Sequence, residues 1–326
     1  MSKLVTIYGG SGFVGRYIAR RMAKEGWRVR VAVRRPNEAM HVKPYGAVGQ
    51  VEPVLCNIRD DASVAQAMDG ADAVVNCVGI LAESGKNKFD AVQHEGAERI
   101  ARLAAAAGIT TMVHLSAIGA SEASASEYAQ SKALGEVGVL EHMPNAMILR
   151  PSVVFGPEDD FFNSFASMTK LGPILPLVGG NTKFQPVYVD DVAQAAVQGI
   201  LGNATGTYEL GGPDVETLSG LIGDMLSVIH RRRLVINLPF FVGGIMGFAF
   251  DMLQSLTLGL FSNTVLTRDQ VKLLKSDNVV AEDAKTLADL GIVATPASTV
   301  LPDYLWRFRP SGQYDAIKDS AKNLEA

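Results

Sequence analysis

A tyrosine and a lysine that could perform acid–base chemistry lie four residues apart, at Tyr128 and Lys132. In the helix predicted over residues 126–142, this spacing places both side chains on one face. A free phenol is a poor acid or base at neutral pH, but a neighbouring ammonium favours the phenolate and should lower the pKa of Tyr128. Ser116, at the end of the strand predicted before it, could orient a substrate carbonyl. Three nearby serines could take that role instead: Ser121, Ser124 and Ser126.

A glycine-rich turn near residue 9 has the spacing of a phosphate-binding loop. The strand predicted over residues 4–8 runs into Gly9, Gly12 and Gly15, spaced G-x-x-G-x-x-G, and a helix follows. The first glycine permits a tight turn, the second lets the backbone approach a pyrophosphate, and the third allows close packing of helix on strand. A turn kept only for packing is the alternative, but its position between strand and helix favours a dinucleotide. The residues predicted to hold the ligand here are Gly9, Ser11, Gly12, Phe13, Val14 and Gly15.

Two arginines follow the second predicted strand, where an NAD site usually has an acidic residue for the ribose 2′-hydroxyl. Arg34 and Arg35 instead offer guanidinium groups that bind a 2′-phosphate in bidentate fashion. The sequence therefore predicts NADP(H) as the cofactor, with a solvated basic loop as the alternative interpretation. Further residues at the ends of the third and fourth strands are predicted to lie along the same cofactor: Asn57, Ile58, Cys77, Val78 and Gly79.

Strand and helix patterns alternate through the first half of the chain, which is typical of βαβ units. They predict an α/β protein, a doubly wound Rossmann fold with a parallel sheet and helices on both faces. Residues 1–155, completed by about 184–205, are assigned to this domain, and residues 156–183 and 206–326 to a smaller, mostly C-terminal second domain. Strands are predicted over residues 4–8, 28–33, 51–56, 73–77, 111–115, 146–149 and 186–189. Helices are predicted over residues 12–25, 62–68, 89–107, 126–142 and 192–201.

The composition excludes several classes of protein. The net charge is −4, so no overall positive field attracts nucleic acid, and we expect no such partner. The two cysteines, Cys56 and Cys77, and the five histidines lack metal-ligand spacing, so we expect no metal and a reducing compartment. There is neither a signal-peptide pattern nor a run of about 18 uncharged apolar residues, so we expect an intracellular protein without a transmembrane span.

The glycine turn, Ser116, Tyr128 and Lys132 together resemble the extended branch of the short-chain dehydrogenase/reductase superfamily. The resemblance implies that these three side chains are catalytic or only contact the cofactor. It also implies that residues 150–156 pass the nicotinamide, which adds Pro151 and Val153 to the candidates, and that Asp191 caps a following helix. One departure weakens a standard adenine contact, because the superfamily usually has Asp where this chain has Asn57.

Much of the chain also resembles the nucleotide-binding accessory subunits of respiratory complex I (NADH:ubiquinone oxidoreductase). This resemblance implies a bound NADPH that is mainly structural, with core subunits near the quinone-reduction region as partners. Without a targeting segment, it indicates a bacterial relative, peripheral on the cytoplasmic side of the inner membrane. The segments that carry the resemblance are residues 150–156, 159–168, 172–174, 185–192, 267–271 and 289–296.

An apolar stretch over residues 234–261 follows three arginines, Arg231 to Arg233. One interpretation is a buried core helix of the second domain, although Pro239 and several glycines disfavour a helix. The other is an interfacial element whose apolar side meets lipid or a membrane subunit, with the arginines facing anionic headgroups. The complex I resemblance favours the second interpretation.

Three functional hypotheses follow from these observations. The first is an NADP(H)-carrying accessory subunit of complex I, in which the cofactor stabilises the fold by binding linkage. The second is a free-standing NADP-dependent oxidoreductase or epimerase, with Tyr128 as acid–base, Lys132 tuning it and Ser116 polarising a carbonyl. The third is a dinucleotide sensor that binds protein partners without chemistry.

Overall fold

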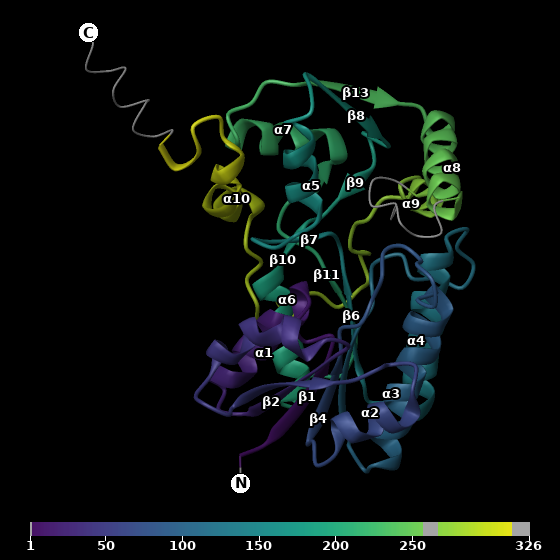
Figure 1. Cartoon of the computed structure of the whole chain (residues 1–326), viewed down its shortest axis with the longest axis vertical. Coiled ribbons are helices and arrows are strands. Elements are labelled where there is room, and N and C mark those ends of the chain that lie inside the picture. The colour runs from purple at the N-terminus through teal and green to yellow at the C-terminus, as the bar shows by residue number, and fades with distance from the viewer. Residues whose placement is uncertain (1, 257–266, 315–326) are drawn as a thin grey trace.

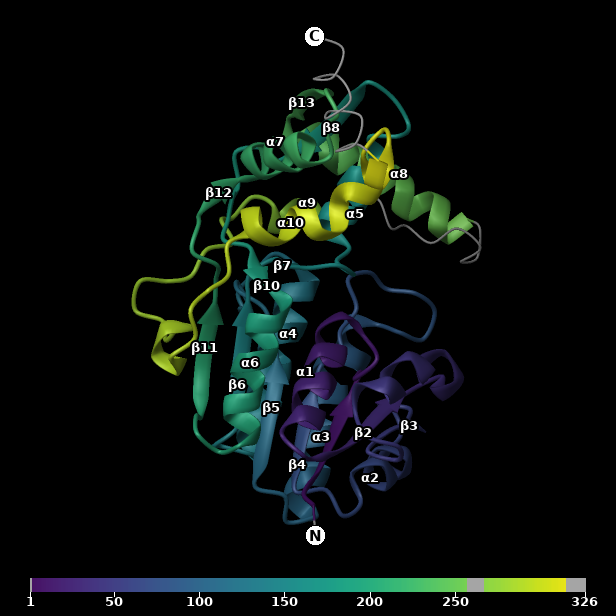
Figure 2. The same ribbon diagram turned by 90° about the vertical axis from the view of Figure 1, so that its left-hand side faces the viewer.

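A parallel sheet of seven strands forms the lower body of the molecule in the computed structural model, which describes residues 2–256 and 267–314 (Figure 1). Seen face-on in Figure 2, the strands follow the order β11-β6-β5-β4-β1-β2-β3. This sheet confirms the predicted α/β Rossmann class. The strands are β1 (Leu4–Tyr8), β2 (Arg28–Val33), β3 (Val51–Leu55), β4 (Ala73–Asn76), β5 (Thr111–Leu115), β6 (Met147–Pro151) and β11 (Gly206–Leu210).

Helices cover both faces of this sheet, because its central strands are apolar on both sides. On one face α1 (Phe13–Lys24) and α6 (Val189–Ile200) pack against side chains such as Ile7 and Val113. On the other face α2 (Asp61–Met68), α3 (Glu95–Ala106) and α4 (Glu127–His142) pack against Tyr8 and Ile148. The two cores fix the position of every loop at the carboxyl edge of the sheet.

Several local predictions were wrong. Residues 206–210, assigned to the second domain, form β11 and pair in parallel with β6 in the main sheet. Helix α6 begins at Val189 rather than at residue 192, so Asp191 lies inside its first turn and caps nothing. Its carboxylate instead accepts hydrogen bonds from the backbone N–H and the hydroxyl of Thr295. The helix predicted over residues 89–107 is present, but it begins with a π-helical turn, Asp90–His94, that the sequence did not indicate and that leads into α3.

The upper body has a core of its own, formed by short strands and helices around aromatic side chains. Phe161 and Phe162 of α5 (Phe161–Met168) make edge-to-face contacts with each other, and Phe162 packs in the same way against Phe155. The apolar segment 159–168 is therefore explained by packing. The remaining elements are β7 (Val154–Phe155), β8 (Ile174–Val178), β9 (Lys183–Phe184), β10 (Val187–Tyr188), β12 (Glu216–Thr217), α7 (Leu218–Val228), β13 (Leu234–Leu238), α8 (Phe240–Leu256), α9 (Arg268–Leu273) and α10 (Ala297–Leu305).

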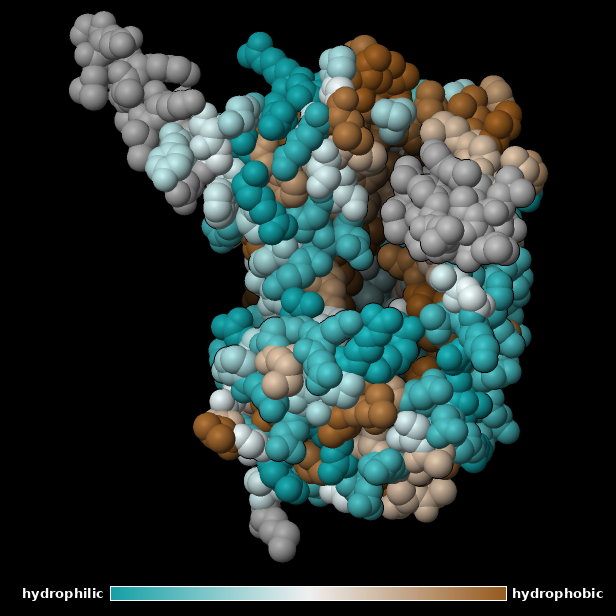
Figure 3. Space-filling model, in the orientation of Figure 1, coloured by the Kyte–Doolittle hydropathy of each residue, from teal (hydrophilic) through white to brown (hydrophobic). Residues whose placement is uncertain are grey.

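The apolar stretch forms β13, which pairs in parallel with β8, and then α8; residues 257–261 lie outside the described part of the chain. Its large side chains are exposed rather than buried, with Phe241 70% and Ile245 65% exposed, so a buried core helix is excluded. Brown atoms gather over this region at the top of Figure 3. We call the exposed set the apolar face: Leu171, Ile174, Leu234, Ile236, Phe240, Phe241, Ile245, Phe248 and Met252.

Two of the three arginines beside the apolar face donate hydrogen bonds to carbonyl groups of the upper body. The Arg231 guanidinium donates to the Phe308 carbonyl at 2.8 Å, and that of Arg233 donates to the Thr169 carbonyl at 2.9 Å. Arg232 is exposed. The expectation that all three guanidinium groups face outward was therefore wrong. Over the described ranges 2–256 and 267–314, no helix combines the length and the apolar character needed to cross a bilayer.

Candidate dinucleotide site

The candidate site residues lie at one edge of the main sheet, where the carboxyl ends of its parallel strands meet. The chain order reverses between β1 and β4, and in open α/β sheets a ligand binds in the crevice beside such a switch point. Gly9 directly follows β1 there, and Cys77 directly follows β4. The fold therefore brings the glycine turn and the end of β4 together, although 68 residues separate them in the sequence.

The glycine turn has the geometry that its spacing predicts. Gly9 has a φ of +75°, and a Cβ there would lie 3.2 Å from the backbone of Cys77 and Val78. A Cβ on Gly15 would lie 2.4 Å from the Gly9 carbonyl oxygen, so α1 can approach β1 only with glycine at this position. Gly12 precedes α1 with an extended backbone and is exposed, which leaves the helix N-terminus open to an anion.

Arg16 adds a cation to this turn, and sequence reasoning did not select it. Its guanidinium donates to the carbonyls of Ser11 at 3.1 Å and Gly12 at 3.2 Å, and lies 3.6 Å from Glu158. The side chain is thus held beside the phosphate-binding backbone. A basic residue one position after the last glycine of the motif was the available signal.

The adenine side of the crevice is marked by the residues after β2 and β3. Arg34 is exposed and has no ion pair within residues 2–256 and 267–314. Arg35 pairs with Glu38 at 3.0 Å, so part of its charge is already neutralised. Asn57 is exposed and accepts a hydrogen bond from the Arg59 backbone, and Ile58 is buried. Of the two predicted arginines, Arg34 is thus the one without an ion pair in the described residues.

The opposite side of the crevice holds the Tyr–Lys pair. The Lys132 ammonium donates to the Leu115 carbonyl at 3.1 Å, next to Ser116, and lies 5.9 Å from the centre of the Tyr128 ring. A Cβ on Gly79 would lie 3.4 Å from the Lys132 nitrogen. The structure thus brings Gly79, Ser116, Tyr128 and Lys132 together at the ends of β4 and β5. Ser121 and Ser124 lie in the loop before α4, and Ser126 caps that helix.

Burial controls the protonation of this pair. Desolvation raises the pKa of Tyr128 to about 12, and Lys132 does not offset it. The expectation that Lys132 lowers the phenol pKa was therefore wrong, because Lys132 is buried, Tyr128 is half-buried, and the desolvation of the phenol outweighs the neighbouring charge. Desolvation likewise lowers the pKa of Lys132 to about 8. At neutral pH the phenol is a hydrogen-bond donor and the ammonium is charged.

Three buried polar atoms near the pair have no hydrogen-bond partner in the described chain: Ser116 Oγ, Gln93 Oε1 and His114 Nε2. Ser116 is 4% exposed and Gln93 is 1% exposed. A buried polar group without a partner is costly. A ligand with hydroxyl groups at this edge would offer a donor for Gln93 Oε1 and a donor or acceptor for Ser116 Oγ, whereas His114 lies inside β5. Gln93 was missed by the sequence reasoning because it lies in the unexpected π-helical turn before α3, which no sequence pattern indicated.

Pro151 ends β6 and Val153 lies two residues after it on the same edge, and the carbonyl groups of both residues accept backbone hydrogen bonds. The Pro151 carbonyl accepts from Ile118 at 3.0 Å, and the Val153 carbonyl accepts from Val187 at 2.9 Å. Cys77 is partly buried, and desolvation raises the pKa of its thiol to about 12. The thiol is therefore protonated and unreactive. The glycine turn and buried polar atoms that lack a partner in the described chain lie at this edge of the sheet. Their arrangement fits a nicotinamide dinucleotide.

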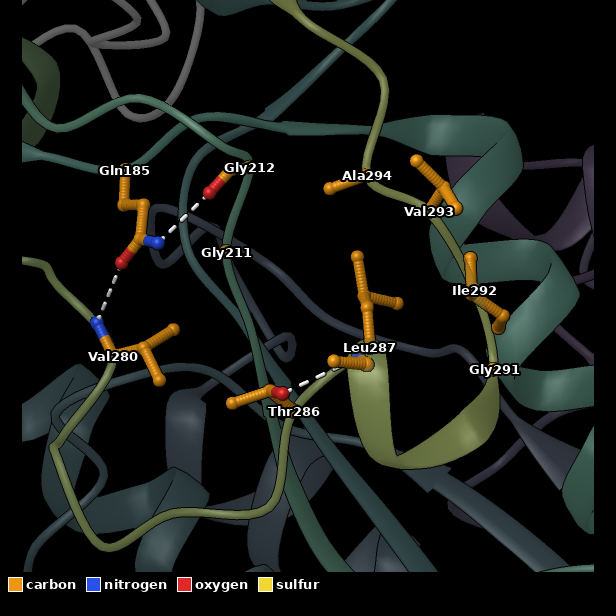
Figure 4. Close-up of a pocket in the computed structure, with 11 residues that line it drawn as sticks. Gln185, Gly211, Gly212, Val280, Thr286, Leu287, Gly291, Ile292, Val293 and Ala294 are labelled. Carbon is orange, nitrogen blue, oxygen red and sulfur yellow. Dashed lines mark hydrogen bonds between the residues drawn. The ribbon is translucent and has the colours of Figure 1, made fainter.

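A cavity of about 550 Å³ lies elsewhere, between the end of β11 and residues 280–294 (Figure 4). Its one large polar side chain, Gln185, is already bound to Gly212 and Val280, at 2.8 and 3.1 Å. Apolar side chains such as Leu287 and Ile292 line the rest. Because none of the candidate site residues lines it, this cavity is separate from the glycine turn.

Fold and site together place the chain among the doubly wound Rossmann proteins. The chain belongs to the NAD dependent epimerase/dehydratase family, whose model matches residues 5–211. Its fold is similar to that of the Bordetella bronchiseptica enzyme WbmH in complex with NAD+, with a TM-score of 0.68 at 17% identity over 96% of this chain and 100% of that one. It is also similar to Thermus thermophilus UDP-glucose 4-epimerase, with a TM-score of 0.67 at 19% identity over 94% and 99% of the two chains.

Relatives by sequence include subunits of the respiratory chain. The chain is 35% identical to NADH dehydrogenase (ubiquinone) 1 alpha subcomplex subunit 9, mitochondrial, of Arabidopsis thaliana, over 95% of this chain and 79% of that protein. The mouse protein of the same name is 32% identical over 94% and 80%. A bacterial relative, the ceramide reductase of Caulobacter vibrioides, is 31% identical over 72% of this chain and 74% of that protein.

Proposed function

We propose that this chain is an accessory subunit of respiratory complex I that carries NADP(H) mainly as a structural cofactor. The observation that carries the proposal is the likeness to named complex I subunits along 95% of the chain, which includes the upper body and its apolar face. Core subunits near the quinone-reduction region are the proposed partners, and the cytoplasmic side of a bacterial inner membrane is the proposed location. Bound cofactor would stabilise the fold by mass action, because the unfolded chain has no such site.

The choice of NADP(H) over NAD(H) is supported by charge. The guanidinium of Arg34, which is exposed and makes no ion pair with the described residues, would meet the 2′-phosphate at the end of β2. The glycine turn would hold the pyrophosphate, with Arg16 beside it. The ribose on the nicotinamide side would receive hydrogen bonds from the Tyr128 phenol and the Lys132 ammonium. This arrangement provides a partner for the 2′-phosphate, for the pyrophosphate and for the ribose on the nicotinamide side.

The apolar face is the proposed contact with the rest of the assembly. Exposed apolar patches of this kind mark sites of protein or membrane contact. Since Arg231 and Arg233 are tied to carbonyls of the upper body, we favour an apolar protein subunit as the occupant and a lipid surface as the alternative. Most of the face lies on α8 and β13, with Leu171 just before β8 and Ile174 at its start, and all of it is well separated along the chain from the glycine turn.

A second candidate function is supported by Ser116, Tyr128 and Lys132. A free-standing NADP-dependent oxidoreductase or epimerase would use Ser116 to polarise a carbonyl, Tyr128 to donate or accept the proton and Lys132 to stabilise the phenolate. The cofactor would supply the hydride. The unpartnered hydroxyl of Ser116 and the likeness to a protein named as a reductase favour this candidate.

Co-migration after mild detergent extraction tests the two candidates. In its own host, the tagged chain should migrate with the quinone-reducing complex in native electrophoresis. The Tyr128→Phe variant should assemble as well as the wild type. If the chain migrates alone, and its bound NADPH is oxidised on adding a small carbonyl or a sugar nucleotide, the accessory-subunit proposal fails and the enzyme is favoured.

A further inference from the structure

Asp269, in the short helix α9, binds the N-terminus of the helix that carries Tyr128 and Lys132. Its Oδ2 accepts hydrogen bonds from the Ser126 hydroxyl at 2.6 Å and the Tyr128 backbone N–H at 3.1 Å. Its Oδ1 accepts from the Glu127 N–H at 2.9 Å. The Ser126 hydroxyl oxygen accepts in turn from the Ala129 N–H at 3.3 Å. Two side chains thus satisfy the first three N–H groups of α4, which have no partner within the helix.

This contact is stronger than an ordinary helix cap. The carboxylate makes charge-assisted hydrogen bonds and also lies at the positive end of the dipole of α4. One of its bonds is to the backbone of Tyr128 itself, so a shift of Asp269 moves the residue whose phenol faces the crevice. The side chain of Asp269 is 17% exposed, so water competes for these bonds only weakly.

Helix α9 is itself positioned by α8. A Cβ on Gly247 of α8 would lie 2.9 Å from the Arg268 backbone nitrogen, so the two helices touch through their backbones. The Arg268 N–H donates to Asp251 at 3.2 Å, and its guanidinium lies 5.4 Å from the Phe248 ring, which belongs to the apolar face. Figure 1 shows α8, α9 and α4 following one another down the same side of the molecule.

We propose that Asp269 is a positioning residue for the nicotinamide half of the dinucleotide site, and that α9 transmits to it the position of the apolar helix α8. The inference rests on the proposed function, because it assumes that a dinucleotide occupies the crevice. It adds a link between two distant sites. A partner seated on α8 and a bound dinucleotide then change each other's affinity by the same factor.

The Asp269→Asn variant tests the first half of the proposal. It keeps the shape of the side chain but turns one acceptor into a donor that faces N–H groups. Glu127→Gln is the matched control, because it removes a charge from the same helix end, where the exposed Glu127 side chain makes no cap. Two probes separate the halves of the site: NADPH, and adenosine 2′,5′-bisphosphate, which lacks the nicotinamide half.

We expect Asp269→Asn to weaken NADPH binding about tenfold, the scale of a lost charge-assisted hydrogen bond, and to leave adenosine 2′,5′-bisphosphate binding unchanged. Glu127→Gln should leave both dissociation constants within about twofold of wild type. Equal weakening of the binding of both probes would show that Asp269 has only a general structural role. Unchanged binding of both probes would show that Asp269 has no role in the site. Either result overturns this inference but leaves the proposed function standing. A wild-type chain that binds neither probe overturns the proposed function with it.

The Gly247→Ala variant tests the link to α8. Its new methyl group must push Arg268 away, whereas Gly244→Ala in the same helix meets nothing within 4 Å and serves as the control. Gly247→Ala should weaken NADPH binding several-fold and Gly244→Ala should not. The effects of Gly247→Ala and Asp269→Asn should not multiply in the double variant, since both act on one contact. Full multiplication, or identical effects of the two glycine variants, would show that α8 and the dinucleotide site are uncoupled.

Discussion

The glycine turn and the apolar face differ in how far contacts within the chain explain their residues. In the turn, each small residue is explained by a nearby backbone: Gly9 meets the end of β4, and Gly15 meets Gly9. On the apolar face, Phe241 and Ile245 extend from α8 with more than half of their surface exposed. The geometry of the first region is thus explained by contacts within the chain and fits a bound ligand. The second leaves large apolar side chains exposed in the described part of the chain, and we therefore propose binding for the first region and assembly for the second.

The largest effect should come from the glycine turn. Gly15→Ala places a methyl group 2.4 Å from the Gly9 carbonyl oxygen, so α1 must move away from β1. We expect a loss of about 3 kcal/mol or more in dinucleotide binding, roughly a hundredfold or greater weakening. Calorimetric titration with NADPH measures it. Gly244→Ala, which meets no atom within 4 Å, is the control, and near wild-type binding by Gly15→Ala would refute the assigned geometry.

The apolar face should respond in the opposite sense. Phe241→Asp places a charge on a side chain that is 70% exposed, so the isolated protein should keep its melting temperature and its affinity for NADPH. Assembly should fall strongly, because a central aromatic residue at an interface contributes about 2 kcal/mol or more. Native electrophoresis of extracts measures the assembled fraction. Leu201→Asp, on an exposed residue after α6, is the matched control. Equal assembly of both variants would show that the apolar face is not a contact with the rest of the assembly.

Arg34 should set cofactor preference. Arg34→Asp replaces the unpaired guanidinium with a carboxylate that repels the 2′-phosphate, and we expect NADPH binding to weaken by about 2 kcal/mol while NADH binding holds or improves. The ratio of the two dissociation constants is the readout. Arg35→Asp should change this ratio less, because Arg35 already pairs with Glu38. An unchanged ratio in Arg34→Asp would contradict the NADP(H) assignment.

Lys132 should give the empty protein a distinctive pH dependence. Burial lowers the pKa of this ammonium to about 8, so the unfolded chain binds more protons than the folded chain between about pH 8 and its usual pKa of 10.5. The contribution of Lys132 to stability therefore rises with pH across that window. Lys132→Met should be more stable than wild type at pH 7 by roughly 2 kcal/mol, once the lost hydrogen bond to Leu115 is allowed for.

Chemical unfolding at pH 7 and pH 10 checks this sign. The advantage of Lys132→Met should shrink toward the higher pH, as the wild-type lysine loses its proton in the folded state. An advantage that grows with pH would contradict the assigned burial. Saturating NADPH should reduce the advantage at pH 7, because the ammonium then gains a partner at the ribose.

Local patterns in the sequence predicted the main sheet well. The strands over 28–33 and 111–115 were predicted with their observed bounds, since buried β-branched residues between polar ends indicate a parallel strand. Strand β11 was assigned to the wrong domain because its place is set by pairing with β6, which depends on tertiary structure and not on the local pattern. The early start of α6 was missed for a similar reason, because its first turn is held by Thr295.

The site was predictable where its chemistry is local. The glycine spacing and the Tyr128–Lys132 spacing identified residues that the fold does bring to one edge. The pKa of Tyr128 was predicted with the wrong sign, because a sequence shows a neighbouring charge but not the desolvation that outweighs it. The role of Asp269 was invisible for a further reason. Its partners lie more than 140 residues away, and no spacing rule connects them.

Native mass spectrometry of gently extracted material tests the central claim most directly, since one spectrum reads both the bound nucleotide and the partner subunits. We expect a mass for this chain that includes one NADP(H), within a particle that also contains complex I subunits. Phe241→Asp should release the chain with its nucleotide still bound. A wild-type chain that leaves the membrane fraction alone, or that carries NAD(H) or no nucleotide, would contradict the account.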